Sequence, residues 1–286
     1  METRRRRTYV FGIGVATLAA AAALLLGGGS QAAPGHSYLA LGDSVTFGFI
    51  TQAGFEYGNP ENFVGFPEYG GDVLRLQTVN ASCPGETTAS FLSATGVDNG
   101  CRSFRSQAPL HVAYTGTQLD YATTFLTEHP NTSLVTIQLG ANDAFVLQKQ
   151  CLGDPTCIAT GLPAVLASIS AHMDTILRDL RATGFHGILM VVNYYSLDYG
   201  NAAGTALTQA LNGAVTSHAQ ADGAVVADAF AAFQQAAAGA SGHTCQAGLL
   251  NASPQNQFTC DVHPSQSGQK LLAQVVENRY IAATGG

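Results

Sequence analysis

Three apolar runs constrain the fold of this chain more than any other feature. They are residues 38–41, 133–139 and 187–192, and none of them alternates apolar with polar residues as a strand with one solvated face does. The segments between them carry apolar residues at helical spacing, most clearly over 163–182. Strands that alternate with helices in this way predict βαβ units and a parallel sheet with helices on both faces.

Shorter elements complete this prediction. We expect two further strands at 77–80 and 224–226, and further helices at 68–76, 116–128, 205–221, 227–237 and 267–282. The stretches expected to be loops or irregular are 46–67, 93–113 and 240–260. The 286 residues are 46% hydrophobic and only 11% charged, so the chain can bury a large core. No segment has the composition of an interdomain linker, and we expect residues 33–286 to form a single domain.

The N-terminus has the organisation of an export signal. Arg4 to Arg7 precede an uncharged apolar stretch over 8–26, and residues 30–32 fit a small-x-small cleavage site. We therefore expect residues 1–32 to be a signal peptide, removed from a secreted protein that keeps no stable membrane anchor. Two alternatives stay open: twin-arginine export, because the arginines form a run, and an uncleaved anchor, because the apolar stretch is nearly long enough to span a bilayer.

The net charge limits the binding partners that this chain can have, and its cysteine content indicates the environment in which it folds. Removal of residues 1–32 takes away four of the twelve Lys and Arg and one of the nineteen Asp and Glu, which leaves a net charge of −10. An acidic chain without a basic cluster is a poor partner for nucleic acid or anionic membranes. The six cysteines indicate disulfides, and their clustering favours Cys83–Cys101, Cys151–Cys157 and Cys245–Cys260 among 15 possible pairings. We expect no metal or cofactor, and a monomer.

Polar residues follow three of the predicted strands. Ser44 lies in a Gly-Asp-Ser break after the first strand, Gly85 follows the second, and Asn142 lies in Gly-Ala-Asn-Asp after the third. Open α/β sheets place their ligands at the carboxyl ends of the strands, so we expect these residues at one edge. For each of these residues alone, a role in a turn is at least as good an explanation as a role in catalysis. Together they offer a hydroxyl nucleophile and three donors for an oxyanion, namely the N–H groups of Ser44 and Gly85 and the Asn142 amide.

His263 is the histidine best placed to activate Ser44. A serine hydroxyl needs a base to remove its proton, and histidine is the usual one near neutral pH. Of the eight histidines, only His263 has an aspartate two residues before it and a proline directly after it. The carboxylate of Asp261 would fix the tautomer of the imidazole and stabilise the imidazolium.

In their order along the chain, these blocks resemble the SGNH hydrolase family, also called GDSL esterases and lipases. The matching blocks are Gly42-Asp43-Ser44-Val45, Gly85, Gly140-Ala141-Asn142-Asp143 and Asp261-Val262-His263-Pro264. The resemblance implies a flavodoxin-like α/β/α sandwich with about five parallel strands. It also implies Ser44 as nucleophile and His263 as general base, with the oxyanion hole formed as above. The signal and the cysteines resemble those of secreted actinobacterial members.

The histidine block departs from the family pattern. The family commonly has its aspartate three residues before the histidine, where this chain has Cys260. Either the side chain of Asp261 reaches the imidazole from a tighter turn, or a backbone carbonyl near 260–261 orients His263, as in some relatives. We favour the Asp261 side chain.

The expected substrate is a carboxylic ester, and the sequence leaves its class open. Residues 46–67 contain side chains that would either line an acyl site or anchor the loop: Phe47, Phe49, Ile50, Phe55, Tyr57, Phe63 and Phe66. Residues 193–196 follow a predicted strand and are expected to border the same cleft. Because the chain has no Trp, we favour an esterase or lipase acting on lipid or short-to-medium acyl esters over a carbohydrate acetyl esterase. A non-catalytic binding protein on the same scaffold is the remaining alternative.

Overall fold

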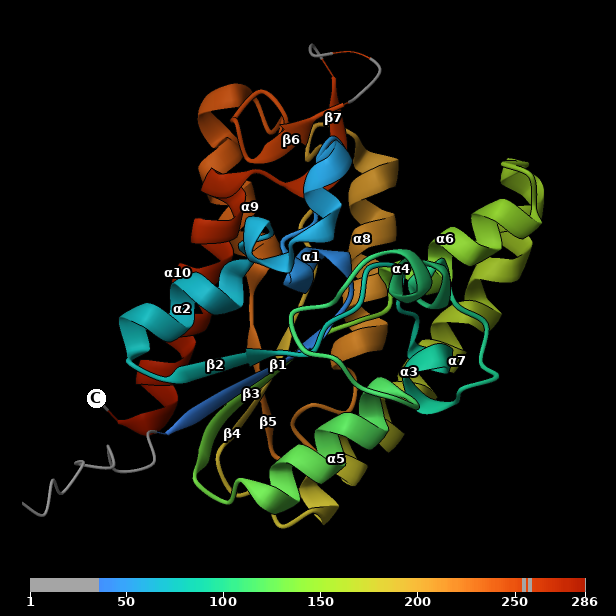
Figure 1. Ribbon diagram of the computed structural model, residues 1–286. Coiled ribbons are helices and arrows are strands. Elements are labelled where there is room, and N and C mark those ends of the chain that lie inside the picture. The colour runs from blue at the N-terminus through green and yellow to red at the C-terminus, as the bar shows by residue number, and fades with distance from the viewer. Residues whose placement is uncertain (1–35, 254–255, 257–258, 286) are drawn as a thin grey trace, which may run out of the picture. The chain divides into compact units, whose positions relative to one another are not determined.

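A five-stranded parallel sheet forms the centre of the fold (Figure 1). The structure is a computed structural model that describes residues 36–253, 256 and 259–285, so the predicted signal peptide over 1–32 lies outside the described residues. The strands are β1 Ser37–Gly42, β2 Gln77–Asn80, β3 Thr132–Gln138, β4 Ile188–Val192 and β5 Ala224–Ala227. Their order, β2-β1-β3-β4-β5, is that of flavodoxin-like folds, which confirms the predicted fold class.

Helices cover both faces of this sheet. On one side α10 packs against α2 and α9, and on the other α7 packs against α5 and α8 (Figure 1). These helices are α2 Phe66–Leu74, α5 Gln118–Glu128, α7 Pro155–Ala182, α8 Ala202–Thr216, α9 Ala229–Ala237 and α10 Gln266–Thr284. Every residue of β1 is buried, as expected of a strand covered on both faces.

Helix α7 is longer than the sequence predicts. The prediction begins it at residue 163, but Asp154 accepts a hydrogen bond from the Cys157 N–H at 2.7 Å and caps a start at Pro155. By length and composition α7 could cross a membrane, and no other described helix passes that test. Its C-terminal half packs into the core through Ile169, Met173, Ile176, Leu177 and Leu180.

The structure contains several short elements that the sequence does not predict. The helices among them are α1 Ser44–Phe47, α3 Thr88–Leu92, α4 Cys101–Gln107 and α6 Ala141–Gln150. Two short strands, β6 Leu250–Ala252 and β7 Cys260–Pro264, form a separate antiparallel sheet. The three disulfides are Cys83–Cys101, Cys151–Cys157 and Cys245–Cys260, the neighbour pairing that the sequence favours.

Candidate active site

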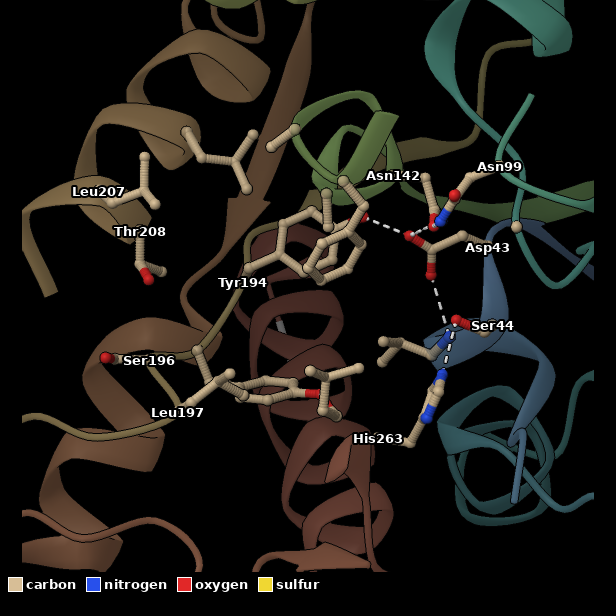
Figure 2. A pocket seen from close by; sticks show the side chains of 18 of the residues that line it. Asp43, Ser44, Asn99, Asn142, Tyr194, Ser196, Leu197, Leu207, Thr208 and His263 are labelled. Atoms are coloured by element: carbon tan, nitrogen blue, oxygen red, sulfur yellow. Dashed lines mark hydrogen bonds between the residues drawn. The ribbon is translucent and has the colours of Figure 1, made fainter. Parts of the chain in front are cut away.

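Ser44 and His263 meet at the carboxyl end of β1. Ser44 begins α1 directly after β1, and His263 lies in β7. The His263 Nε2 is 3.0 Å from the Ser44 Oγ (Figure 2). Phe49 packs against the imidazole, with ring centroids 4.9 Å apart. An imidazole at this distance from a hydroxyl can take up its proton.

Three buried carboxamides hold the turn that carries Ser44. Gln118 accepts a hydrogen bond from the Gly42 N–H at 2.6 Å and donates one to the Gly42 carbonyl at 3.0 Å. Asn80 and Gln269 each donate to a carbonyl within α1. Gly42 has a φ of 149°, and a Cβ there would lie 2.6 Å from a carbonyl oxygen of β3. The turn therefore requires glycine at this position and is fixed by the core.

Asp261 lies on the other side of the imidazole. Its Oδ2 is 3.4 Å from the His263 Nδ1, and its Oδ1 accepts the His263 backbone N–H at 2.7 Å. The Thr51 hydroxyl donates to the same Oδ2. Burial raises the pKa of Asp261, but the hydrogen bonds from His263 and Thr51 outweigh burial and hold this pKa below its ordinary value. The carboxylate is thus ionised at neutral pH and faces the nitrogen opposite Ser44.

The segment that carries His263 is fastened at three points. The Tyr195 hydroxyl donates to the Val262 carbonyl at 2.7 Å. The Cys245–Cys260 disulfide ties the start of β7 to the preceding loop, and β6 pairs with β7. The Cys245–Cys260 disulfide is thus one of several attachments that position His263.

Three N–H donors border the same cavity as Ser44. Gly85 has a φ of 86°, and a Cβ there would lie 2.9 Å from backbone atoms of Asn99 and Cys101, so this close approach requires glycine. Asn142 lies in the first turn of α6 and is buried. Within the part of the chain that the structure describes, neither the Ser44 N–H nor the Gly85 N–H donates to a protein acceptor. All three groups line the cavity and are available to an oxyanion.

The Asn142 amide is held between two side chains. Its Oδ1 accepts a hydrogen bond from the Asn99 Nδ2 at 2.7 Å, and its Nδ2 lies 3.4 Å from the Asp43 Oδ2 (Figure 2). Asp43 also caps α1 by accepting the Val45 N–H at 2.9 Å, and it accepts the Tyr194 hydroxyl at 2.6 Å. Burial raises the pKa of Asp43 to about 6, although these hydrogen bonds oppose that rise.

A cavity of about 640 Å³ opens at Ser44 and His263. Tyr194, Tyr195 and Ser196, which follow β4, line it as expected. Its far wall comes from helices α6, α7 and α8 and is mainly apolar: Phe145, Leu162, Leu166, Gly204, Leu207 and Leu211. Figure 2 shows Leu207 and Thr208 of α8 across the cavity from the Ser44 side. This volume lies within the range of small-molecule sites.

Most aromatic residues of the loop after α1 do not face this cavity. Of the set proposed from the sequence, Phe49 alone lines it. Phe47 and Phe63 are buried in a small cluster around the Cys83–Cys101 disulfide, whereas Phe55 is 95% exposed. The rings therefore mainly anchor the loop, and the space for a substrate lies toward α6, α7 and α8.

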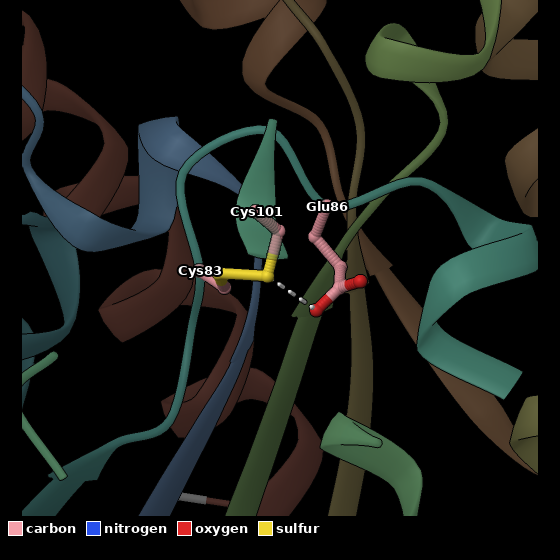
Figure 3. Close-up of side chains that lie close together, drawn as sticks. All are labelled: Cys83, Glu86 and Cys101. Carbon is pink, nitrogen blue, oxygen red and sulfur yellow. Dashed lines mark hydrogen bonds between the residues drawn. A yellow bond between two sulfur atoms is a disulfide. The ribbon is translucent and has the colours of Figure 1, made fainter. Parts of the chain in front are cut away.

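Glu86 lies against the Cys83–Cys101 disulfide behind the site (Figure 3). One of its oxygens is 3.5 Å from the Cys101 Sγ and 3.1 Å from the Gln118 Nε2. Burial raises the pKa of Glu86 to about 7, against the effect of its hydrogen bonds. Because both sulfurs are joined in a disulfide, neither is a thiolate that could bind a metal ion. The cluster instead supports Gln118, which holds Gly42.

Sequence reasoning does not point to Thr51, Asn99 or Gln118, although each contacts a site residue. Their partners are 210, 43 and 76 positions away in the chain. A hydroxyl or amide that acts through so distant a contact leaves no local spacing pattern. One signal was present for Gln118, a polar residue at the start of a helix whose other inward positions are apolar.

The chain belongs to the GDSL-like lipase/acylhydrolase family, whose model matches residues 40–271. Family and fold together define the class of hydrolases that act on esters. No curated protein sequence matches the chain.

Solved structures with the same fold share little sequence with this chain. A phospholipase A1 from Streptomyces albidoflavus has a TM-score of 0.56 at 19% identity, over 86% of this chain and 99% of that one. An alpha/beta hydrolase from the metagenome of Lake Arreo, Spain, has a TM-score of 0.53 at 17% identity, over 88% and 96%. An acetylxylan esterase from Geobacillus stearothermophilus has a TM-score of 0.53 at 15% identity, over 86% and 94%. At these identities the likeness concerns the fold.

Proposed function

We propose that this protein is a serine esterase that cleaves carboxylic esters through an acyl-enzyme. Ser44 is the nucleophile, His263 the general base, and Asp261 the carboxylate that orients the imidazole. The observation that carries the proposal is the 3.0 Å distance between the His263 Nε2 and the Ser44 Oγ, at the opening of a largely apolar cavity.

In each half of the reaction His263 takes up a proton and then gives it back. The Ser44 Oγ attacks the carbonyl carbon while Nε2 takes its proton, and the same proton passes to the alcohol as its bond to carbon breaks. Water then attacks the acyl-serine, again losing a proton to His263, and Ser44 regains a proton as the acid leaves. The ionised Asp261, 3.4 Å from Nδ1, stabilises the imidazolium in both halves.

The negative charge on the carbonyl oxygen requires donors that are already in place. The N–H groups of Ser44 and Gly85 and the Asn142 Nδ2 supply them in this proposal. Their positions are supported by the buried turn at Gly42 and by the contacts of Asn142 with Asn99 and Asp43.

The lining of the cavity supports esters of aliphatic acids as substrates. An acyl chain that starts at Ser44 and extends toward α8 meets mainly leucine and phenylalanine side chains. Each methylene removed from water there gains about 0.8 kcal/mol at most. We therefore propose lipid esters or short-to-medium acyl esters as the substrate class.

Secretion is part of the same proposal. The three disulfides and the predicted signal over 1–32 support an oxidising extracellular environment. The catalytic unit would be a single domain over 33–286 that works as a monomer without metal or cofactor.

A series of p-nitrophenyl esters, from acetate to palmitate, tests the proposal with the wild type and Ser44→Ala. We expect Ser44→Ala to lose at least about 10⁴-fold in kcat. For the wild type, we expect kcat/KM to rise about two- to fourfold per added methylene until the cavity is filled. Turnover of the acetate ester alone would favour a carbohydrate acetyl esterase. If the wild type turned over no ester faster than Ser44→Ala does, a non-catalytic binding protein would be the remaining interpretation.

A further inference from the structure

A line of hydrogen bonds runs from the protein surface to the Asn142 amide. The Lys149 Nζ lies 2.5 Å from the Asn99 Oδ1, and the Asn99 Nδ2 donates to the Asn142 Oδ1 at 2.7 Å. Lys149 is exposed in the last turn of α6, and Asn142 lies in the first turn of the same helix. Asn99 precedes α4, and its backbone N–H donates to the Gly85 carbonyl at 2.8 Å. Asn99 thus contacts both Asn142 and Gly85, two of the residues proposed to bind the oxyanion.

The ammonium group sets the direction of both amides. Lys149 can only donate, so Asn99 presents its oxygen to Lys149 and its NH₂ to Asn142. Asn142 must then accept with its oxygen, which turns its own NH₂ toward Asp43 and the cavity. The two amide dipoles are aligned with a positive charge at the outer end, and hydrogen bonds in such a row polarise one another.

We propose that Asn99 and Lys149 are positioning residues for the oxyanion hole. They fix the orientation of the Asn142 amide and strengthen its donation to the carbonyl oxygen as negative charge develops there. This inference rests on the proposed function, in which Asn142 is an oxyanion donor. Because that charge exists only near the transition state, loss of the row lowers kcat and leaves KM unchanged.

The chain offers matched variants for this test. Lys149→Met removes the charge and keeps the aliphatic stem, and Lys149→Arg keeps both the charge and the donors. Lys270→Met removes the charge of the only other lysine, which lies exposed on α10 over the Tyr69 ring. With p-nitrophenyl butyrate we expect kcat to fall about two- to fivefold for Lys149→Met, with no change for Lys149→Arg or Lys270→Met.

Asn99 variants examine the inner bond of the row. Asn99→Ala removes it, and we expect a fall of about tenfold in kcat with unchanged KM. Asn99→Asp has the same size but cannot donate to Asn142 once ionised, so it should lower kcat at least as much. Melting temperatures within a few degrees of the wild type would exclude loss of folding as the cause.

The decisive measurement repeats Lys149→Met in an Asn142→Ala background. If Lys149 acts through Asn142, it has no further effect on kcat there, whereas Asn142→Ala alone lowers kcat about 10²- to 10³-fold. A further fall in that background, or no effect of Lys149→Met in the wild type, overturns the inference and leaves the proposed function intact. Wild-type kcat in Asn142→Ala would instead reject the oxyanion role of Asn142 and, with it, the inference.

Discussion

Two groupings of a hydroxyl, an imidazole and a carboxylate lie in the described part of the chain, and they differ in the order of the three groups. In Ser44, His263 and Asp261 the imidazole is in the middle, 3.0 Å from the hydroxyl and 3.4 Å from the carboxylate. Ser44 and His263 of this grouping border the cavity. The other lies where α3, α6 and α7 meet.

In the second grouping the hydroxyl is in the middle. The Thr88 Oγ1 donates to the Asp143 Oδ1 at 2.6 Å and lies 2.8 Å from the His172 Nδ1. Its proton is already bonded to a carboxylate, so the imidazole cannot take it. Thr88 is also 0% exposed, and no ester could reach it. The same three chemical groups therefore form a buried structural contact here and the proposed reactive site at Ser44.

The largest expected effect is on kcat, and it distinguishes His263 from His172. His263→Gln removes the proposed general base, and we expect kcat to fall at least about 10⁴-fold in an ester assay. His172→Gln, the matched change in the other grouping, should keep kcat within about twofold. A comparable loss in both variants would show that the order of the groups does not decide function.

Asp261 is the next test. Asp261→Asn keeps the size of the side chain but removes the charge that stabilises the imidazolium, and we expect kcat to fall about 10²-fold. The control is Asp174→Asn, which changes a surface aspartate 3.5 Å from His218. Activity unchanged in Asp261→Asn would mean that a backbone group orients His263.

Thr88→Val probes the structural grouping. The change removes the Thr88 hydroxyl that donates to the Asp143 Oδ1 and leaves the backbone N–H of residue 88 as a donor to Oδ2. Loss of the hydroxyl donor to this half-buried carboxylate should lower the free energy of unfolding by about 2 kcal/mol. We expect kcat to change less than threefold at a temperature where the variant is folded. Chemical denaturation together with ester assays measures both, and a stable but inactive Thr88→Val would contradict this assignment.

The two histidines also differ in what holds them. His172 lies within the long helix α7, whereas His263 lies in a five-residue strand tied down by Cys245–Cys260. We expect the double variant Cys245→Ala/Cys260→Ala to lose about tenfold in kcat, close to 1.4 kcal/mol in activation free energy, because His263 is less well positioned.

The control for this variant is the disulfide between α6 and α7, which does not border the cavity. Cys151→Ala/Cys157→Ala should retain its activity. Equal activity of the two double variants below their melting temperatures would count against the idea.

The smallest expected effect is the change in stability with pH, and its sign differs between Asp261 and Asp143. The folded-state pKa of Asp261 is lowered, so its stabilisation is present above the ordinary value of 3.8 and is lost as pH falls through the folded value. Burial raises the pKa of Asp143, although the hydrogen bonds from Thr88 oppose that rise. The contribution of Asp143 to stability is therefore most favourable below its ordinary pKa of 3.8 and weakens as pH rises through the raised value.

Denaturant unfolding between pH 3 and pH 7 tests this. The stability lost in Asp261→Asn should grow with pH, and the stability lost in Asp143→Asn should shrink. Parallel profiles for the two variants would refute the assignment.

The sheet was predictable because buried strands are marked by composition. The expected strand at 77–80 coincides with β2, and the others differ by one or two residues at their ends. Residues that follow the carboxyl ends of those strands had to meet at one edge, so Ser44, Gly85 and Asn142 could be proposed together. The single Asp-x-His-Pro block pointed to His263.

Elements that depend on distant partners could not be predicted. Strands β6 and β7 are short and pair Leu250 with Pro264 across an irregular segment, which gives no periodic pattern. Helix α4 lies within an insertion, and its position depends on the Cys83–Cys101 disulfide and on Gly85. Thr51, Asn99 and Lys149 take their roles from three-dimensional neighbours.

Part of the far wall of the cavity belongs to α8, which carries none of the residues in the proposed chemistry. At Gly204 of α8 an added Cβ would meet only the Asn201 side chain, at an ordinary distance of 3.5 Å, so a larger residue fits the backbone and fills the cavity. In the proposed mechanism, the residues that cleave the ester and this part of the acyl site thus lie on separate elements. Descendants of this sequence, or a designer, can alter the accepted acid through α8 while the turn at Ser44 is inherited unchanged.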